Sequence, residues 1–277
     1  MKEIKKKEKF KKIVEDIKKI KIQGASNVAK SALMAYYLFP SKKSKEILMK
    51  SRPTEPMMFR VLNLADKIPR EKILKHFEEA QDKINRYSLN IIKNGDIIIT
   101  HCHSTNVLKA LIYAHKKGKK FLVYNTETRP LYQGRKTALE LKRAGIKVTM
   151  FIDSAIEVML KNKDNKGDFH TKKIFIGADA LLKNGIINKI GSGMIAKIAS
   201  LHKIPFYIIA DSWKFTKKNI PIESRHINEI WDKAPKNIKI KNPAFEFVSK
   251  KYISGIVTEF GFMKYNDFIK KVKKYNF

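Results

Sequence analysis

The residues best suited to chemistry follow apolar runs along the chain. The single cysteine, Cys102, comes directly after the apolar segment 96–101 and shortly before Ser104, a residue type that begins helices. This pattern predicts a buried parallel strand followed by a helix. Open α/β sheets bind ligands at that edge, where the N–H groups of a helix start stabilise a thiolate or a phosphate. A free cysteine is also a common small buried hydrophobe, so position alone leaves both interpretations open.

Polar residues also follow the other predicted strands. Asp153 comes after segment 147–152 and fits a plain helix cap, whereas longer polar loops follow segments 120–125, 173–177 and 205–210. The carboxyl ends of parallel strands lie at the same edge of a sheet, so a set of side chains could converge on one crevice there. The set is Cys102, Glu127, Arg129, Asp179, Asn188, Lys189 and Lys214.

Two segments, 23–26 and 104–106, precede predicted helices and could offer backbone N–H groups to a phosphate. Gly191 and Gly193 are too few for a dinucleotide-binding fingerprint and predict a helix cap instead. His101 and His103 flank the cysteine, but strand alternation points both away from it. No metal site is expected at this pair.

Helical apolar spacing covers most of the first ninety residues, and the pattern changes near Gly95. From there, strands alternate with helices, which is typical of βαβ units and a doubly wound parallel sheet. The predicted helices are 2–21, 26–38, 43–50, 55–66, 70–92, 104–117, 135–144, 154–161 and 191–203, and the predicted strands are 96–101, 120–125, 147–152, 173–177, 205–210 and 254–258. The predicted class is α/β, with an all-helical domain over 1–93 and the parallel sheet over 94–277.

The formal net charge of +33 invites a nucleic-acid interpretation, but its distribution argues against one. Only eight of the 59 basic residues are arginines, and the lysines are scattered along the chain. Sequence-reading proteins concentrate arginine and interleave aromatic residues on one face. A general attraction of anionic substrates is the favoured interpretation.

The cysteine count and the hydropathy pattern indicate the cellular compartment in which the protein is expected. One cysteine allows no internal disulfide and fits a reducing cytoplasm, and it makes a cysteine-based zinc site unlikely within one chain. No apolar run approaches 18 residues, so no membrane span is expected. The charged start of the sequence lacks the apolar block of a secretory signal.

Several short segments resemble one protein family over nearly the whole chain. The family contains archaeal ribose-1,5-bisphosphate isomerases, to which the chain is most similar, with methylthioribose-1-phosphate isomerases and the regulatory subunits of eukaryotic initiation factor 2B. The matching segments are 51–54 (Ser-Arg-Pro-Thr), 100–104 (Thr-His-Cys-His-Ser), 126–130 (Thr-Glu-Thr-Arg-Pro) with 133–134, 153–155, 177–179 (Gly-Ala-Asp), 187–191, 214–215, 235–238 and 242–245.

The resemblance implies a helical domain followed by a Rossmann-like domain that carries most of the active site. It also implies aldose–ketose isomerisation of ribose 1,5-bisphosphate to ribulose 1,5-bisphosphate, with Asp179 as general acid and Cys102, as thiolate, as general base. No metal or cofactor is needed for such a proton transfer. Substrate contacts carry over to Gln23, Gly24, Ala25, Ser26, Arg52, Ser104, Thr105, Asn106, Asn188, Lys189 and Lys214. The family context implies an archaeal, cytoplasmic homo-oligomer, a dimer or hexamer, acting in AMP and nucleoside metabolism.

One departure from the family pattern lies at Gln23, where the isomerases usually have arginine. Glutamine cannot supply the charged fork that grips a phosphate. The alternatives are therefore a non-catalytic regulatory subunit acting on initiation factor 2, and a methylthioribose-1-phosphate isomerase with an apolar recess. The pair of Cys102 and Asp179 favours an enzyme, and the cations Arg52 and Lys214 favour a bisphosphate.

Overall fold

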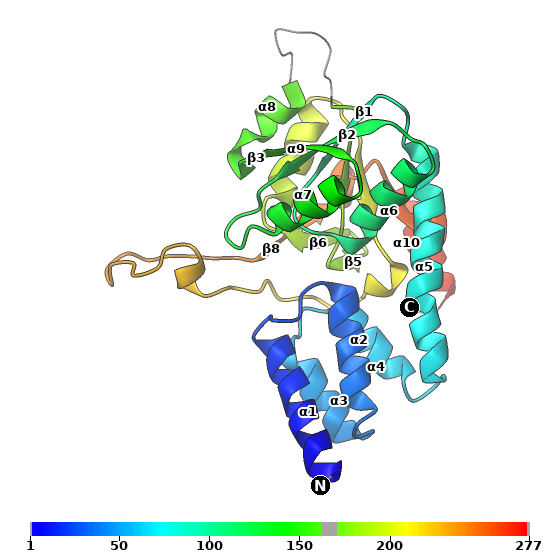
Figure 1. Cartoon of the computed structure of the whole chain (residues 1–277), viewed down its shortest axis with the longest axis vertical. Helices are drawn as coiled ribbons and strands as arrows, with labels where there is room; N and C mark the ends of the chain where they lie inside the picture. The colour runs from blue at the N-terminus through cyan, green and yellow to red at the C-terminus, as the bar shows by residue number, and fades with distance from the viewer. Residues whose placement is uncertain (1, 162–170, 276–277) are drawn as a thin grey trace.

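The amino-terminal third of the chain is a helical unit in the computed structural model, which describes residues 2–161 and 171–275. Figure 1 shows α1 to α4 packed side by side below the sheet. The Ser41 hydroxyl accepts from the Ser44 N–H at 3.1 Å and so starts α3, and a proline opens α4. The helices are α1 (Lys2–Lys18), α2 (Ala25–Tyr36), α3 (Lys42–Ser51), α4 (Pro56–Leu64) and α5 (Arg70–Ile91).

Helix α5 joins the helical unit to the sheet. Its first turns contribute Ile73 and Phe77 to the apolar core of α1 to α4, whereas Ile84 lies in the core beneath the sheet. The carboxyl half of α5 packs along α6 (Thr105–Lys116). One helix thus fixes the helical unit against the rest of the chain (Figure 1). The proposed domain boundary near residue 93 stays a prediction.

Within the described residues, the main sheet has seven strands in the order β10-β9-β7-β4-β1-β2-β3. All pairs are parallel except β9 with β10, and Ile99 of β1 lies opposite Tyr124 of β2. The predicted α/β class with a parallel sheet is confirmed. The strands are β1 (Asp96–Thr100), β2 (Phe121–Thr126), β3 (Lys147–Phe151), β4 (Lys173–Ile176), β7 (Phe206–Ile209), β9 (Gly255–Thr258) and β10 (Gly261–Met263).

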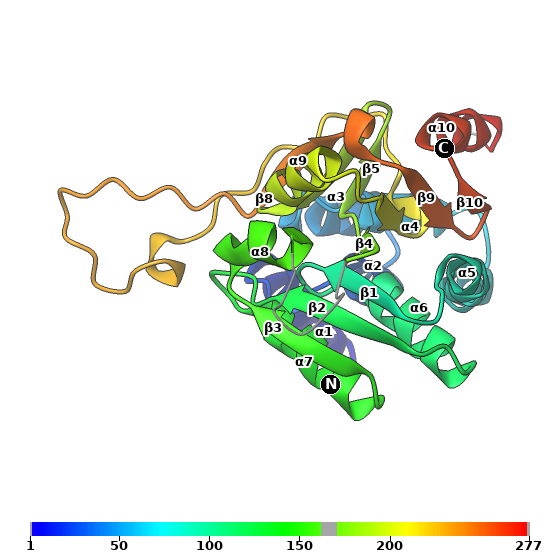
Figure 2. The same ribbon diagram turned by 90° about the horizontal axis from the view of Figure 1, so that it is seen from above.

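Helices cover both faces of this sheet, as Figure 2 shows from above. Side chains alternate along each strand, so Ile98 packs with α5, α6 and α7, whereas Ile97 and Ile99 pack with α8, α9 and α10. Two separate apolar layers result, which explains why β1 reads as a continuous apolar run. The helices are α7 (Gln133–Arg143), α8 (Ile156–Lys161), α9 (Ser192–Leu201) and α10 (Tyr265–Lys274).

A second, antiparallel sheet was absent from the sequence prediction. It contains β5 (Ala180–Leu182), β6 (Gly185–Lys189) and β8 (Phe245–Ser249), in that order. Strand β5 has only three residues, too few to show a period, although the Asn184-Gly185 pair is a recognised hairpin signal. Also unpredicted were β10, α10 and three short 3₁₀ turns: η2 (Ser212–Lys214), η3 (Ile227–Glu229) and η4 (Lys250–Tyr252). The predicted helix 154–161 begins with a 3₁₀ turn, η1 (Asp153–Ala155), and continues as α8.

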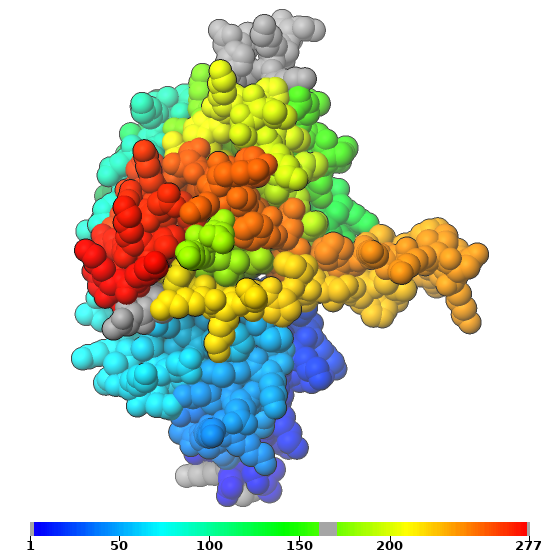
Figure 3. Space-filling view, turned by 180° about the vertical axis from the view of Figure 1, so that it is seen from behind, coloured from blue at the N-terminus to red at the C-terminus, as the bar shows by residue number. Residues whose placement is uncertain are grey.

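Residues 216–244 form an extended arm between η2 and β8. Figures 1 and 2 show the arm running away from the body, and Figure 3 shows it standing out from the surface. A bridge between Ser224 and Pro243 closes its base. Large apolar side chains are exposed along it: Ile222, Ile227, Ile230, Trp231 and Ile238. Among the described helices, none is both long and apolar enough to cross a membrane.

Candidate active site

A cavity of about 360 Å³ lies where the carboxyl edge of the main sheet meets the helical unit. The sheet side contributes the residues that follow β1 and β4, the end of β6, and η2 after β7. The helical side contributes the start of α2 and the connection between α3 and α4. This is the edge at which parallel sheets hold ligands.

The cavity brings together every residue that the sequence prediction assigned to catalysis or substrate binding. They are Gln23, Gly24, Ala25, Ser26, Arg52, Cys102, Ser104, Thr105, Asn106, Asp179, Asn188, Lys189 and Lys214. Two other candidates, Glu127 and Arg129, do not line it. The Glu127 carboxylate lies 3.3 Å from the Arg135 guanidinium, and the Arg129 guanidinium donates to the carbonyl of Ile230 in the arm. Their loop turns outward, so the expectation for these two was wrong.

Cys102 lies at a sharp turn between β1 and α6. Its φ of 64° is in the left-handed region, which is unusual for a residue other than glycine. The turn is held on both sides: the Cys102 N–H donates to the Thr128 hydroxyl at 2.9 Å, and its carbonyl accepts from the Thr137 hydroxyl at 2.9 Å. The loop after β2 and helix α7 therefore support a strained backbone at the proposed base.

The thiol of Cys102 is not activated in this structure. The sequence predicted a lowered pKa from the adjacent helix start, but burial, with the nearby Asp179 charge, raises the pKa of Cys102 to about 12. The His103 N–H and the Lys189 ammonium act in the opposite direction and are outweighed. The prediction of a lowered pKa was wrong because the loss of solvation outweighs the stabilisation of the thiolate by the helix start.

Asp179 reaches the cavity through a close approach of two elements. Gly177 follows β4, and a Cβ placed there would lie 2.4 Å from the Ser104 hydroxyl at the start of α6. Only glycine lets these segments touch, and the contact brings Asp179 to the same cavity as Cys102. Burial raises the pKa of Asp179, although Lys214, Arg52 and Lys189 favour its charged form. A raised pKa suits a general acid.

Three cations lie buried around these two groups. Lys189 ends β6, Lys214 lies in η2, and Arg52 follows α3. The Lys214 ammonium donates to the carbonyl of Ala178 at 2.7 Å, next to Asp179. Buried cations are costly unless an anion pairs with them, so this wall is suited to a phosphorylated ligand.

The starts of α2 and α6 face the same cavity. Gly24 begins α2 with no capping side chain, and the Ser104 hydroxyl accepts from the Val107 N–H at 3.5 Å in α6. Uncapped N–H groups at a helix start attract anions. The start of α9 differs, since the Glu246 carboxylate accepts from the N–H groups of Gly191 and Gly193. The predicted capping role of that glycine segment is confirmed.

Both histidines beside Cys102 line the cavity, contrary to the prediction from strand alternation. Strand β1 ends at Thr100, so the alternation does not extend to them. His101 donates from Nε2 to the carbonyl of Ile190 at 2.8 Å, and its Nδ1 lies 2.6 Å from the Thr126 hydroxyl. Burial lowers the pKa of His101, so the ring is neutral and already has partners at both nitrogens.

Sequence reasoning missed other residues of the cavity. Glu55 lies just after the recognised Ser-Arg-Pro-Thr segment, which was the available signal. Lys109 of α6 and Lys136 of α7 gave no signal in the sequence, because lysines are scattered along the whole chain. The additional lining residues include Asn27, Glu55, Lys109, Leu131, Gln133, Lys136, Glu140, Arg225 and Phe245.

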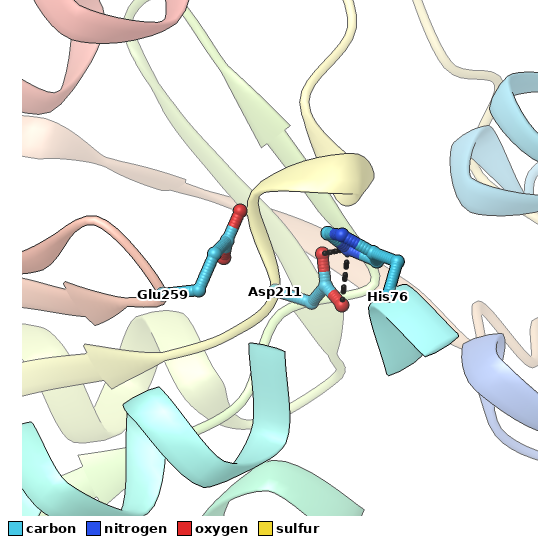
Figure 4. A group of neighbouring side chains, drawn as sticks. All are labelled: His76, Asp211 and Glu259. Atoms are coloured by element: carbon cyan, nitrogen blue, oxygen red, sulfur yellow. Dashed lines mark hydrogen bonds and ion pairs between the residues drawn. The ribbon is translucent and has the colours of Figure 1, made fainter. Parts of the chain in front are cut away.

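A second polar cluster joins the helical unit to the sheet. Figure 4 shows His76 of α5 beside Asp211 after β7, with Glu259 nearby, and their ligand-type atoms lie within 4.8 Å of one another. His76 Nε2 is 3.1 Å from Asp211 Oδ1, and its ring stacks on Trp213 at 3.5 Å. Glu259 accepts from the Ser212 N–H and hydroxyl. These bonds occupy the carboxylates, so the cluster acts as a clamp on η2, which carries Lys214.

Fold and site together define an α/β protein with a cation-lined cavity at the carboxyl edge of its parallel sheet. The chain belongs to the family described as the initiation factor 2 subunit family, whose model matches residues 41–265.

Relatives in this family include proteins with different names. A ribose 1,5-bisphosphate isomerase of Methanocaldococcus jannaschii is 34% identical, over 91% of this chain and 90% of that protein. The crystal structure of a translation initiation factor eIF-2B from Pyrococcus horikoshii has a TM-score of 0.79 and 26% identity, covering 92% of this chain and 96% of that one. A 5-methylthioribose 1-phosphate isomerase from the same organism has a TM-score of 0.76 and 26% identity, over 96% and 88%.

Proposed function

We propose that this protein is a sugar-phosphate isomerase that converts ribose 1,5-bisphosphate to ribulose 1,5-bisphosphate. The observation that carries the proposal is the shared cavity, in which a carboxyl group with a raised pKa and the single thiol are surrounded by buried cations. The isomerase relatives of similar length agree with it. The regulatory alternative is not favoured, because it needs neither the thiol nor the cations.

In the proposed reaction, the Asp179 carboxyl group gives its proton to the ring oxygen, and the bond from that oxygen to carbon one breaks. The Cys102 thiolate removes the proton from carbon two, which forms an enol between carbons one and two. The Cys102 thiol then returns its proton to carbon one, while the hydroxyl on carbon two gives its proton to the Asp179 carboxylate. Atoms and charge balance, and both groups end as they began.

The raised pKa of Cys102 sets a condition on this mechanism. The Cys102 thiol holds its proton when no ligand is bound, since burial and the nearby Asp179 charge raise its pKa. The reactive thiolate must therefore form in the ligand-bound site, and transfer of the thiol proton to the Asp179 carboxylate would give the thiolate and remove the charge that opposes it. The Lys189 ammonium and the His103 N–H are the groups that stabilise the thiolate there.

The phosphates are proposed to bind at the starts of α2 and α6 and at Lys189 and Lys214. At Gln23 the backbone is suited to this role, since Gly24 opens α2 with its N–H groups uncapped by a side chain. Backbone amides and lysines thereby replace the charged fork of an arginine. Holding the phosphates also prevents loss of the anionic group from the open sugar.

The decisive experiment incubates the purified protein with ribose 1,5-bisphosphate or with methylthioribose 1-phosphate and follows ketose formation directly. The expected result is turnover of the bisphosphate to the ketose. Cys102→Ser should lose turnover while retaining binding, and Asp179→Asn should lose about 10²–10⁴ in kcat. Preferred turnover of the methylthio sugar would assign the other isomerase activity, and no turnover of either would refute an isomerase.

A homo-oligomer is part of the same proposal. The exposed apolar residues of the arm support it, because Trp231 is 49% exposed and Ile230 is 40% exposed on a segment that leaves the body. Contact with a second copy would bury them. Light scattering on the purified protein should give a multiple of the chain mass, and Trp231→Asp should reduce it. A monomer at all concentrations would contradict this part.

A further inference from the structure

Glu55 is a buried carboxyl group that the proposed mechanism does not use. It occupies the N-cap of α4, where a carboxylate usually bonds the first N–H groups of the helix, but its side chain makes no such bond. Instead the residue lines the cavity and is only 1% exposed. Its side chain is therefore placed to line the cavity rather than to cap the helix.

Glu55 and Arg52 both have buried side-chain atoms that make no hydrogen bond within the described residues. Glu55 Oε1 lies 3.4 Å from Arg52 Nε, whereas Glu55 Oε2 has no hydrogen-bond partner among the described residues. Arg52 Nη1 is likewise buried without a hydrogen-bond partner in that part of the chain. Buried polar atoms are normally paired, so an unpartnered acceptor and an unpartnered donor on two contacting side chains point to a ligand group that completes both.

A sugar hydroxyl fits this pair better than a phosphate does. A hydroxyl can donate to Glu55 Oε2 and accept from Arg52 Nη1, because it is both donor and acceptor. A phosphate would meet the Glu55 carboxylate, and the Glu223 carboxylate 3.7 Å from Arg52 already offsets the guanidinium charge.

We propose that the Arg52–Glu55 pair binds a hydroxyl of the sugar and that Glu55 is a specificity-determining residue of this site. The inference rests on the proposed function and refines it, since it assigns Arg52 to the sugar rather than to a phosphate. A deoxy ligand lacks the hydroxyl that would pair with the buried carboxylate. Such a site therefore discriminates strongly against deoxy sugars.

The test measures dissociation constants by calorimetry in a Cys102→Ser background, so that ligand is not consumed. The probes are ribose 1,5-bisphosphate and its 2-deoxy and 3-deoxy analogues, each with and without Glu55→Ala. The protein that retains Glu55 should bind one of the two deoxy analogues at least tenfold more weakly than it binds ribose 1,5-bisphosphate. That penalty should shrink to about twofold in Glu55→Ala, because carboxylate and hydroxyl form one interaction.

Glu223→Gln is the matched control, since it also removes an Arg52 partner but lies outside the cavity lining. It should keep the full deoxy penalty. Equal penalties with and without the Glu55 carboxylate would overturn the inference and leave the isomerase proposal intact. If none of the sugars binds, the isomerase proposal fails and the inference with it. Should Glu55→Ala not fold, Glu55→Leu replaces it, since leucine also lacks a hydrogen-bond acceptor, and an undiminished penalty there again overturns the inference.

Discussion

Replacing Glu55 by glutamine should stabilise the empty protein at alkaline pH. Burial raises the pKa of Glu55 from 4.5 to about 7, although Arg52 favours its charged form and Asp179 adds to the rise. A rise of this size corresponds to about 3 kcal/mol. Because the folded pKa lies above the unfolded one, stability falls as pH rises from about 4.5 to about 7 and is then constant. Glutamine does not titrate, so it avoids this loss.

The measurement is urea unfolding of wild type and Glu55→Gln at pH 5 and pH 8 without ligand. Ionisable groups remote from Glu55 titrate equally in both proteins, so the difference between them reports Glu55 and its coupling to Asp179. The advantage of the variant should grow by about 2–3 kcal/mol between these two pH values. An advantage that is independent of pH would show that the carboxyl group is solvated or fully compensated by Arg52. The burial argument for this residue would then be refuted.

Three other outcomes follow from the structure. Cys102, the only thiol, should react with iodoacetamide at pH 8 at least 100-fold more slowly in the native, ligand-free protein than after unfolding, because its pKa is raised to about 12; equal rates would contradict its burial. Gly177→Ala should lower kcat at least tenfold, since the new methyl group displaces Ser104 at the start of α6. Gly118→Ala is strained by its φ of +86° but lies outside the cavity lining, so it should lower stability and leave kcat unchanged. His76→Phe should keep a ring against Trp213 but lose the hydrogen bond to Asp211. Denaturant titrations should show a loss of about 1–3 kcal/mol in the free energy of unfolding. An unchanged stability would show that this bond is not part of the clamp.

The strand-and-helix pattern was readable because each element carries its own period. Strand β1 and helix α6 differ by at most two residues at either end from the predicted segments, and the other strands of the parallel sheet agree similarly. The small sheet was not predicted because β5 has only three residues and because the pairing of β6 with β8 joins residues 56 or more positions apart. Local patterns do not encode such a partner.

The proposed site was predictable to the extent that polar residues follow parallel strands. Asp179 and Lys214 reached the cavity by that rule, whereas Glu127 and Arg129 obeyed the same rule and did not, because their loop turns toward Arg135 and the arm. Which strand-end loop turns inward depends on what packs against it. Sequence position alone gives no account of that contact.

By itself, the sequence determined the classes of element, their order and the chemical types at the sheet edge, since these depend on local periodicity and residue identity. Only the tertiary structure decided that Arg52 and Glu55 of the helical unit face Cys102 across one cavity, through the packing of α5. It also decided the protonation of the thiol. A pKa depends on the solvent excluded by residues distant in the chain, and burial here outweighs the helix start.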